Sequence, residues 1–298
     1  MNQQETNKKK ITGVLGLGAM GSGIAHNLFK HNQLATVYNR TTKKSEQFQK
    51  NTQVPYKKSL SEFAAQCNVI ITSLSTDSDV LEIIKSLLPN IQAGTIIIDT
   101  STIGVDTVSK CNVLLAGKNS FFLDAPVSGG SEGANNGQLV MMVGGDENIL
   151  NSVTDILSCF TKSISYMGKA GNGQITKAVN QIMAAGINQA VTEALAFAKA
   201  TGLATDKLID TLSGGAAGNW FLDHRGKSML CGDYQPGFKV KLHHKDLLLC
   251  NKMIEDLGEN RLPIVEMTLI HYQRLIDQGY GDEDISALFR SKQTLLKN

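Results

Sequence analysis

Short apolar segments alternate with longer segments of mixed polarity through the first half of the chain. Buried strands are predicted where the chain is short, apolar and rich in Val and Ile, at residues 11–16, 35–38, 67–74, 95–99, 121–125 and 139–143. Segments 19–31 and 78–88 carry apolar residues at helical spacing, and the second stops before Pro89. Strands that alternate with helices predict a doubly wound parallel sheet with helices on both faces, over residues 11–171.

The pattern changes near Gly168, where the segment GKAGNG places three glycines in six residues. From about Gln174 to Thr201, apolar residues recur every three or four positions, which predicts one long helix that ends at Gly202. Further helices are predicted at 206–212, 223–230, 243–257 and 263–278, and no convincing strand follows. We therefore predict an all-α C-terminal domain over residues 172–298.

Composition and charge narrow the classes of function. Apolar residues make up 42% and charged residues 19% of the 298, as in ordinary globular proteins, and a net charge of +2 is too small to indicate nucleic acid or membrane as a partner. Residues 1–10 are polar and predict a flexible tail without the apolar region of a secretory signal. Five widely spaced cysteines without a C-x-x-C pair favour a reducing compartment, and we expect a cytoplasmic protein. No metal is expected, because adjacent His243 and His244 point in different directions on a helix and no other ligand spacing is recognisable.

A glycine-rich turn follows the first predicted strand. The pattern G-x-G-x-x-G is formed by Gly16, Leu17, Gly18, Ala19, Met20 and Gly21. Gly16 would permit the tight turn, Gly18 would let the backbone approach a pyrophosphate, and Gly21 would let the helix pack closely on the strand. Because a helix N-terminus offers free N–H groups and partial positive charge, the turn predicts a dinucleotide site in a Rossmann-type domain, against the alternative of a plain glycine turn.

The end of the second predicted strand indicates which dinucleotide would bind. An acidic side chain usually stands here, about 20 residues past the glycines, and binds the ribose 2′-hydroxyl of NAD. This chain has Asn39, Arg40 and Thr41 instead, and a guanidinium suits the 2′-phosphate of NADP because it stays charged and presents several donors. The alternative is a solvated Arg40. We predict NADP as the preferred cofactor and leave NAD possible.

Two further segments carry candidate chemistry. Ser128, Gly129 and Gly130 follow a predicted strand, and their N–H groups and hydroxyl can form a carboxylate-binding nest, although a surface turn has the same composition. Lys177 lies in the first turn of the long helix, where the helix dipole disfavours a cation. A buried lysine beside an oxidised nicotinamide has a lowered pKa and can exchange a proton near neutral pH, which is the functional alternative to an ordinary surface lysine.

Four motifs, in this order along the chain, resemble those of the β-hydroxyacid dehydrogenases: GLGAMG with NRT, DAPVSGG, GNGQITKAVNQ and KDLLL. This family includes 3-hydroxyisobutyrate dehydrogenase, tartronate semialdehyde reductase and glyoxylate/succinic semialdehyde reductases. The resemblance extends from Ile11 to about Leu288. It implies an oxidoreductase that transfers a hydride between NADP(H) and a small 3-hydroxy acid or semialdehyde that carries a carboxylate.

The resemblance also implies roles for individual residues. Lys177 would be catalytic, and the substrate would contact Ser128, Gly129, Gly130, Asn180 and Phe238. Some members place the orienting Asn four residues after the lysine; that position is Gln181 here, which we keep as a second candidate. Besides the glycine turn and the segment 39–41, the cofactor would contact Leu74, Ser75, Thr102 and Lys245, with Asp246 supporting the lysine. Segment 214–220 would reach toward the substrate.

Several alternatives remain open. An imine reductase typically lacks the lysine, a 6-phosphogluconate-type enzyme normally has a longer helical domain, and a non-catalytic NADP-binding sensor would have lost Lys177. The physiological hydroxy acid and the direction of the reaction are not determined. The long helix is apolar nearly all round, and relatives bury it between subunits, so the C-terminal domain is expected to serve substrate binding and dimerisation in a homodimer or homotetramer.

Overall fold

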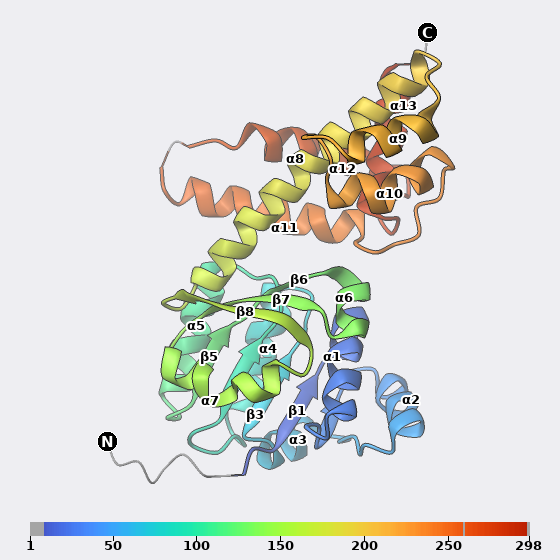
Figure 1. The fold of residues 1–298 in the computed structure, drawn as a ribbon. Helices are drawn as coiled ribbons and strands as arrows, with labels where there is room; N and C mark the ends of the chain where they lie inside the picture. Colours follow the sequence, from blue (N-terminus) through green and yellow to red (C-terminus); the bar gives the residue numbers. More distant parts are fainter. Residues whose placement is uncertain (1–8, 259, 297–298) are drawn as a thin grey trace. The chain divides into compact units, whose positions relative to one another are not determined.

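The computed structural model describes residues 9–258 and 260–296, so most of the tail predicted at 1–10 lies outside the described residues. The chain divides after Lys177 into two compact units, which are described here one at a time (Figure 1). No helix of the described residues is both long and apolar enough to cross a membrane.

The first unit is built around a mixed sheet. Its strands are β1 (Thr12–Leu15), β2 (Thr36–Tyr38), β3 (Val69–Thr72), β4 (Ile96–Asp99), β5 (Phe121–Asp124), β6 (Val127–Ser128), β7 (Leu139–Gly144) and β8 (Thr161–Gly168). They follow the order β2-β1-β3-β4-β5-β7-β6, with β8 paired to β7. Strands β1 to β5 run parallel, whereas β7 is antiparallel to both β5 and β6.

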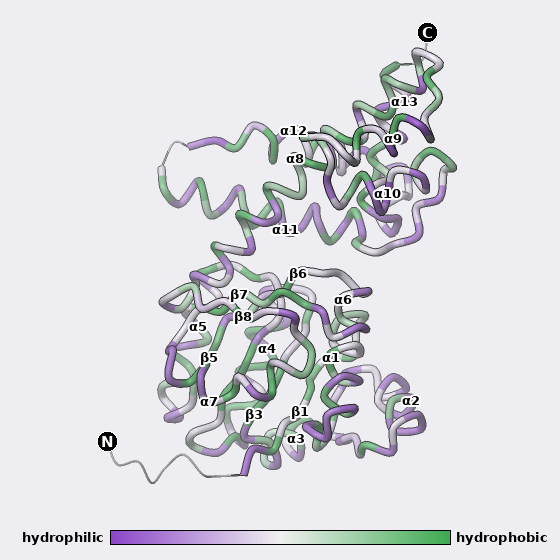
Figure 2. The backbone as a smooth tube through the Cα atoms, in the orientation of Figure 1, coloured by the Kyte–Doolittle hydropathy of each residue, from purple (hydrophilic) through white to green (hydrophobic). Residues whose placement is uncertain are grey.

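Helices cover both faces of this sheet. They are α1 (Ala19–Lys30), α2 (Thr42–Thr52), α3 (Leu60–Gln66), α4 (Asp77–Leu87), α5 (Val105–Ala116), α6 (Gly130–Asn136) and α7 (Glu147–Leu157). One apolar core packs α1, α2, α6 and α7 against the strands, and the other packs α3, α4 and α5. Figure 2 shows the hydrophobic colour concentrated along the central strands.

Neighbouring residues of each central strand enter opposite cores. Val14 belongs to the first core and Leu15 to the second, and Ile98 and Ile97 divide in the same way. Side chains alternate between the two faces of a strand, so a strand covered on both sides is apolar at every position. This arrangement explains why these strands read as continuous apolar runs in the sequence.

The second unit is helical in its described residues. Helix α8 (Asn172–Ala200) starts in the first unit and continues into this one, where it is followed by α9 (Thr205–Ser213), α10 (Trp220–Leu230), α11 (Val240–Glu255), α12 (Pro263–Asp277), the 3₁₀ helix η1 (Ile285–Ala287) and α13 (Leu288–Leu295). Its core contains Leu195, Leu247, Leu275 and Phe289, each at most 1% exposed. Buried Asn188 donates hydrogen bonds to the Tyr272 hydroxyl and the Ile285 carbonyl, which joins α8 to α12 and η1.

The predicted Rossmann-type sheet followed by a helical domain is confirmed, with differences in detail. The sheet is not purely parallel, because β7 runs antiparallel to its neighbours β5 and β6. The elements that were not predicted are helices α2, α3, α5, α6, α7 and α13 and strands β6 and β8. Two of these helices carry a capping residue: α3 begins with Ser59 accepting the N–H of Glu62, and α7 begins with Asp146 accepting two N–H groups. Such capping patterns were an available signal for both helices.

Candidate functional site

The three glycines of the turn after β1 meet different surroundings. Gly16 has a φ of +98°, and a Cβ there would lie 2.3 Å from the Ser73 carbonyl oxygen. A Cβ at Gly21 would lie 1.9 Å from the carbonyl oxygen of Gly16, so α1 packs directly on the turn. A Cβ at Gly18 would have no atom within 4 Å. The turn is therefore tight at its first and third glycines and open at the second, which fits a dinucleotide whose pyrophosphate approaches the backbone.

The residues between these glycines attach the turn to the sheet. Leu17 is buried, and its N–H donates a 2.8 Å hydrogen bond to the Asn39 side-chain oxygen at the end of β2. Met20 packs on the first core, whereas Ala19 is exposed. Asn39 thus joins the end of β2 to the glycine turn, a contact that the sequence did not reveal.

Arg40 and Thr41 follow Asn39 at this edge of the sheet. The Arg40 side chain is 87% exposed, and its guanidinium lies 3.6 Å from the Asp79 carboxylate. Thr41 is exposed and precedes α2 as its N-cap residue, and its carbonyl accepts a hydrogen bond from the Asn39 amide. An exposed ion pair of this length contributes little to stability. The guanidinium is accordingly available to an anionic group that comes close to the end of β2.

Two more predicted cofactor segments follow the ends of β3 and β4. The Leu74 N–H donates to the Ser101 hydroxyl at 2.8 Å, which joins the two segments, and Ser75 is exposed beside it. Buried Gln174 donates to the Ser101 carbonyl at 2.9 Å and accepts the Ile103 N–H at 3.1 Å, so it holds the backbone on both sides of Thr102. In a sheet of this kind ligands bind at the carboxyl ends of the strands, where these segments lie.

Lys177 lies beside the predicted carboxylate nest. Its side chain is buried, and Nζ donates a 2.9 Å hydrogen bond to the carbonyl oxygen of Val127, the residue before Ser128. Ser128 is half-buried at the end of β6, and Gly129 and Gly130 have φ values of +131° and +62°. Positive φ at both glycines turns the backbone sharply as it enters α6. The structure thus brings a buried amine to the start of a glycine turn with backbone donors.

Asp124, the first residue of the DAPVSGG motif, was given no role from the sequence, yet it connects two parts of the candidate site. It is fully buried at the end of β5 and accepts the N–H groups of Gly171 at 2.8 Å and Gln174 at 3.0 Å. Burial raises the pKa of this carboxyl from 3.8 to about 6. These bonds cap the start of α8 and fix it to the end of β5, so Asp124 holds Lys177 near Val127. An acid at the end of a buried strand was the only signal, since its partners lie about 50 residues away along the chain.

A chain of polar contacts joins four predicted residues in the second unit. The Asn180 amide donates to the Gln181 side-chain oxygen at 2.8 Å, and the Gln181 amide donates to Asp246 at 2.7 Å. Asp246 in turn lies 3.0 Å from the Lys245 ammonium. Gln181 is buried, and its side chain connects the Asn180 amide to Asp246.

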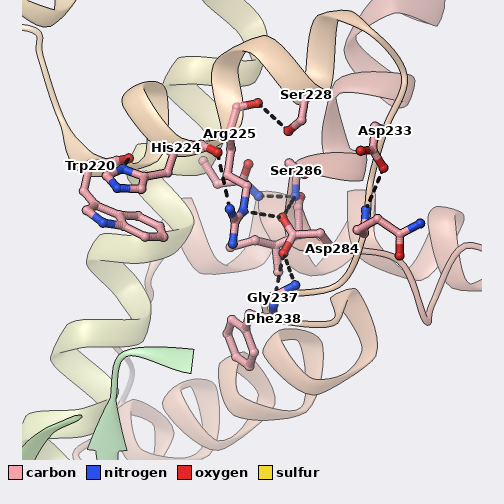
Figure 3. Close-up of polar contacts among 12 residues, drawn as sticks. Trp220, His224, Arg225, Ser228, Asp233, Gly237, Phe238, Asp284 and Ser286 are labelled. Atoms are coloured by element: carbon pink, nitrogen blue, oxygen red, sulfur yellow. Dashed lines mark hydrogen bonds and ion pairs between the residues drawn. The ribbon is translucent and has the colours of Figure 1, made fainter. Parts of the chain in front are cut away.

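His243, which was considered from the sequence only as a metal ligand and not expected to bind one, contacts Gln181, Tyr272 and Phe238. The ring is fully buried, with Nε2 at 3.1 Å from the Gln181 carbonyl oxygen and Nδ1 at 3.0 Å from the Tyr272 hydroxyl. The ring of Phe238, a predicted substrate contact, packs on it with centroids 5.2 Å apart. Figure 3 shows the segment of Phe238 beside the carboxylate of Asp284. Phe238 is therefore connected to Gln181 through a single buried imidazole.

Comparison with known proteins covers nearly the whole chain. Residues 11–168 match the family model described as the NAD binding domain of 6-phosphogluconate dehydrogenase. Residues 171–291 match the model described as NAD-binding of NADP-dependent 3-hydroxyisobutyrate dehydrogenase. The uncharacterized oxidoreductase YkwC of Bacillus subtilis is 33% identical over 285 residues, which cover 95% of this chain and 98% of the relative.

Solved structures with the same fold include two kinds of enzyme. Mycobacterium tuberculosis 3-hydroxyisobutyrate dehydrogenase, solved with L-serine, aligns with a TM-score of 0.86 and 28% identity over 95% of this chain and 99% of its own. An imine reductase from Pseudomonas sp. aligns with a TM-score of 0.61 and 19% identity over 95% of this chain and 99% of its own. The second likeness shows the fold alone.

Proposed function

Because the chain belongs to the 3-hydroxyisobutyrate dehydrogenase family of NAD(P)-dependent oxidoreductases, we propose that it interconverts a small 3-hydroxy acid and the corresponding semialdehyde with NADP(H). The observation that carries this proposal is the buried Lys177 amine, 2.9 Å from the Val127 carbonyl and next to the turn of Ser128, Gly129 and Gly130. A proton donor beside a carboxylate-binding turn is what the reduction of a short semialdehyde acid requires.

In the reductive direction, the substrate carboxylate binds the N–H groups and hydroxyl of the turn at Ser128. Lys177 and, one helical turn later on α8, Asn180 bind the carbonyl oxygen, with Asn180 oriented by Gln181. NADPH, when bound along the glycine turn, supplies the hydride. Lys177 stabilises the negative charge that develops on the oxygen and donates its proton to it. In the oxidative direction, neutral Lys177 accepts the proton of the hydroxyl.

The preference for NADP is supported by the exposed Arg40 guanidinium at the end of β2. A ribose 2′-phosphate adds charge that a guanidinium binds through charge-assisted hydrogen bonds, whereas the NAD ribose offers a neutral hydroxyl. Asp79 partners Arg40 at 3.6 Å and would have to share it with the phosphate. Lys245, held by Asp246, is proposed to approach the nicotinamide side of the cofactor.

The substrate class is supported by L-serine, the compound with which the Mycobacterium tuberculosis relative was solved, because L-serine is itself a 3-hydroxy acid. The test is a turnover panel of 3-hydroxyisobutyrate, L-serine and succinic and tartronate semialdehydes, each with NADP(H) and NAD(H). A cyclic imine with NADPH tests the imine reductase alternative. We expect turnover of at least one 3-hydroxy acid or semialdehyde and none of the imine. Imine reduction alone, or NADP binding without any turnover, would refute the proposal.

A further inference from the structure

A buried carboxylate, Asp284, organises the segment that carries Phe238. Asp284 is 1% exposed, and one of its oxygens accepts the N–H groups of both Gly237 and Phe238 at 3.0 Å (Figure 3). The other oxygen accepts the N–H of Ser286 at 3.1 Å. The backbone N–H of Ile285 completes the connection by donating to the Phe238 carbonyl at 2.9 Å. The main chain of Phe238 is thus held on both sides by residues around Asp284.

The Asp284 carboxylate also pairs with Arg225, whose guanidinium lies over the ring of Trp220. Arg225 Nε lies 3.6 Å from Asp284, and the Arg225 guanidinium lies 5.4 Å from the centroid of the Trp220 ring. Trp220 is 56% exposed and stacks on His224 with centroids 4.3 Å apart (Figure 3). A Cβ at Gly237 would lie 2.3 Å from an Arg225 nitrogen, so the guanidinium passes directly over this backbone.

Trp220 ends the segment that the family resemblance directs toward the substrate, and Phe238 is the predicted pocket residue. They lie 18 positions apart in the sequence, yet each is connected to Asp284, one through a backbone N–H and the other through Arg225. Phe238 also packs on His243, which contacts the carbonyl of Gln181 on α8. One buried charge therefore constrains both aromatic residues that are candidates for selecting the substrate side chain.

We propose that Asp284, together with Arg225, is a positioning residue that sets the places of Phe238 and Trp220 and thereby the substrate range, without itself contacting substrate. The proposal rests on the proposed function, because it is that reaction whose substrate Phe238 and Trp220 would select. A carboxylate is needed here because both of its oxygens accept hydrogen bonds and its charge attracts the guanidinium. An amide of the same size would present an N–H₂ group to one of these donors.

The test compares Asp284→Asn and Arg225→Met with a matched control. Asp282→Asn removes an exposed carboxylate two residues earlier, where it pairs with Lys239 and Lys241. We expect the substrate KM to rise at least tenfold in Asp284→Asn and Arg225→Met. A tenfold change corresponds to about 1.4 kcal/mol of binding free energy. We expect the KM for NADPH to stay within twofold in all three variants and Asp282→Asn to match wild type. Arg225→Lys, which keeps the charge, should restore part of the substrate affinity.

A second readout needs no substrate. Trp220 is the single tryptophan of the chain, so fluorescence excited selectively at tryptophan reports on this place alone. We expect Asp284→Asn and Arg225→Met to change the emission and the acrylamide quenching of Trp220, and Asp282→Asn to leave both unchanged. If Asp284→Asn does not fold, Gly237→Ala displaces the guanidinium while keeping the carboxylate, and the same rise in substrate KM is expected.

The outcomes separate this inference from the proposed function. If wild type turns over a 3-hydroxy acid but the substrate KM stays within twofold in Asp284→Asn, Arg225→Met and Gly237→Ala, the positioning role is wrong and the proposed function stands. If substrate KM, NADPH KM and melting temperature all deteriorate together, Asp284 is only structural and the inference is overturned. If wild type turns over no member of the panel, the proposed function fails. Unchanged Trp220 fluorescence in Asp284→Asn would then refute the positioning role as well.

Discussion

Replacing Lys177 with Met should remove most turnover while leaving the fold and the binding of NADPH intact. Methionine is close to lysine in length and lacks the amine, so the substitution removes the proton donor with little change in packing. The phosphates of the cofactor are expected to bind at the glycine turn and Arg40, away from this side chain. The matched control is Lys169→Met, at an exposed lysine shortly before α8.

The size of the effect follows from the chemistry proposed for the amine. General acid–base catalysis contributes about 10²- to 10⁴-fold in rate, or roughly 3–5 kcal/mol of activation free energy. The same ammonium would stabilise the developing alkoxide, so the loss in kcat should fall in the upper part of this range. Lys177→Arg should fail almost as completely, because a guanidinium does not release its proton near neutral pH.

The melting temperature distinguishes a catalytic from a structural lysine. Lys177 is 7% exposed, and its loss leaves the Val127 carbonyl without this donor, at a cost of about 1–3 kcal/mol. Removal of a buried ammonium also relieves a desolvation penalty of several kcal/mol. The structure begins α8 at Asn172, so Lys177 lies beyond the first turn in which it was predicted, and the helix dipole adds little to this balance. We therefore expect Lys177→Met to melt no lower than wild type.

The assay measures kcat at saturating NADPH, NADPH affinity by fluorescence titration and melting temperature for wild type, Lys177→Met, Lys177→Arg and Lys169→Met. An Arg variant with activity within about threefold of wild type would refute the proton-transfer role. A Met variant that loses activity only in proportion to its folded fraction would show that the lysine is structural.

Three other predictions concern the cofactor, the pH dependence of stability and the assembly. Arg40→Ala should raise the KM for NADPH at least tenfold and the KM for NADH little, and a wild-type preference for NADH would contradict the assignment. Burial raises the pKa of Asp124 from 3.8 to about 6, so the native state binds this proton more tightly than the unfolded chain, and stability should fall as pH rises between these values and then level off. Urea unfolding of wild type and Asp124→Asn should therefore show a stability difference that changes across this window by on the order of 3 kcal/mol, and parallel curves would contradict it. Val179 and Met183 are 53% and 62% exposed on α8, so light scattering should show a dimer or tetramer that Met183→Glu weakens, whereas a wild-type monomer at micromolar concentration would refute assembly through this helix.

The glycine turn and the central strands could be predicted, because each is determined by residues close together in the sequence. The glycine turn at Gly16–Gly21 was recognisable because the conformation of a tight turn and the start of a helix are local properties. The central strands were recognisable because a strand buried on both faces is a short apolar run. Helix α2 buries only Ser45, Phe48 and Thr52, which leaves too few apolar positions for a helical pattern to be recognised in the sequence.

The order of strands at the end of the sheet and the contacts of the candidate site were decided by tertiary structure. Nothing local to Asp124 indicates that its carboxylate caps a helix that begins about 50 residues later. The contact of Gln181 with Asp246 joins residues 65 positions apart, and that of Phe238 with Asp284 joins residues 46 positions apart. A hydrogen bond between distant residues leaves no periodicity in the sequence, since its partners are brought together only when the cores of their elements pack. The amino-acid sequence therefore determined which chemical groups this protein carries, and the burial of apolar surface determined which of them meet.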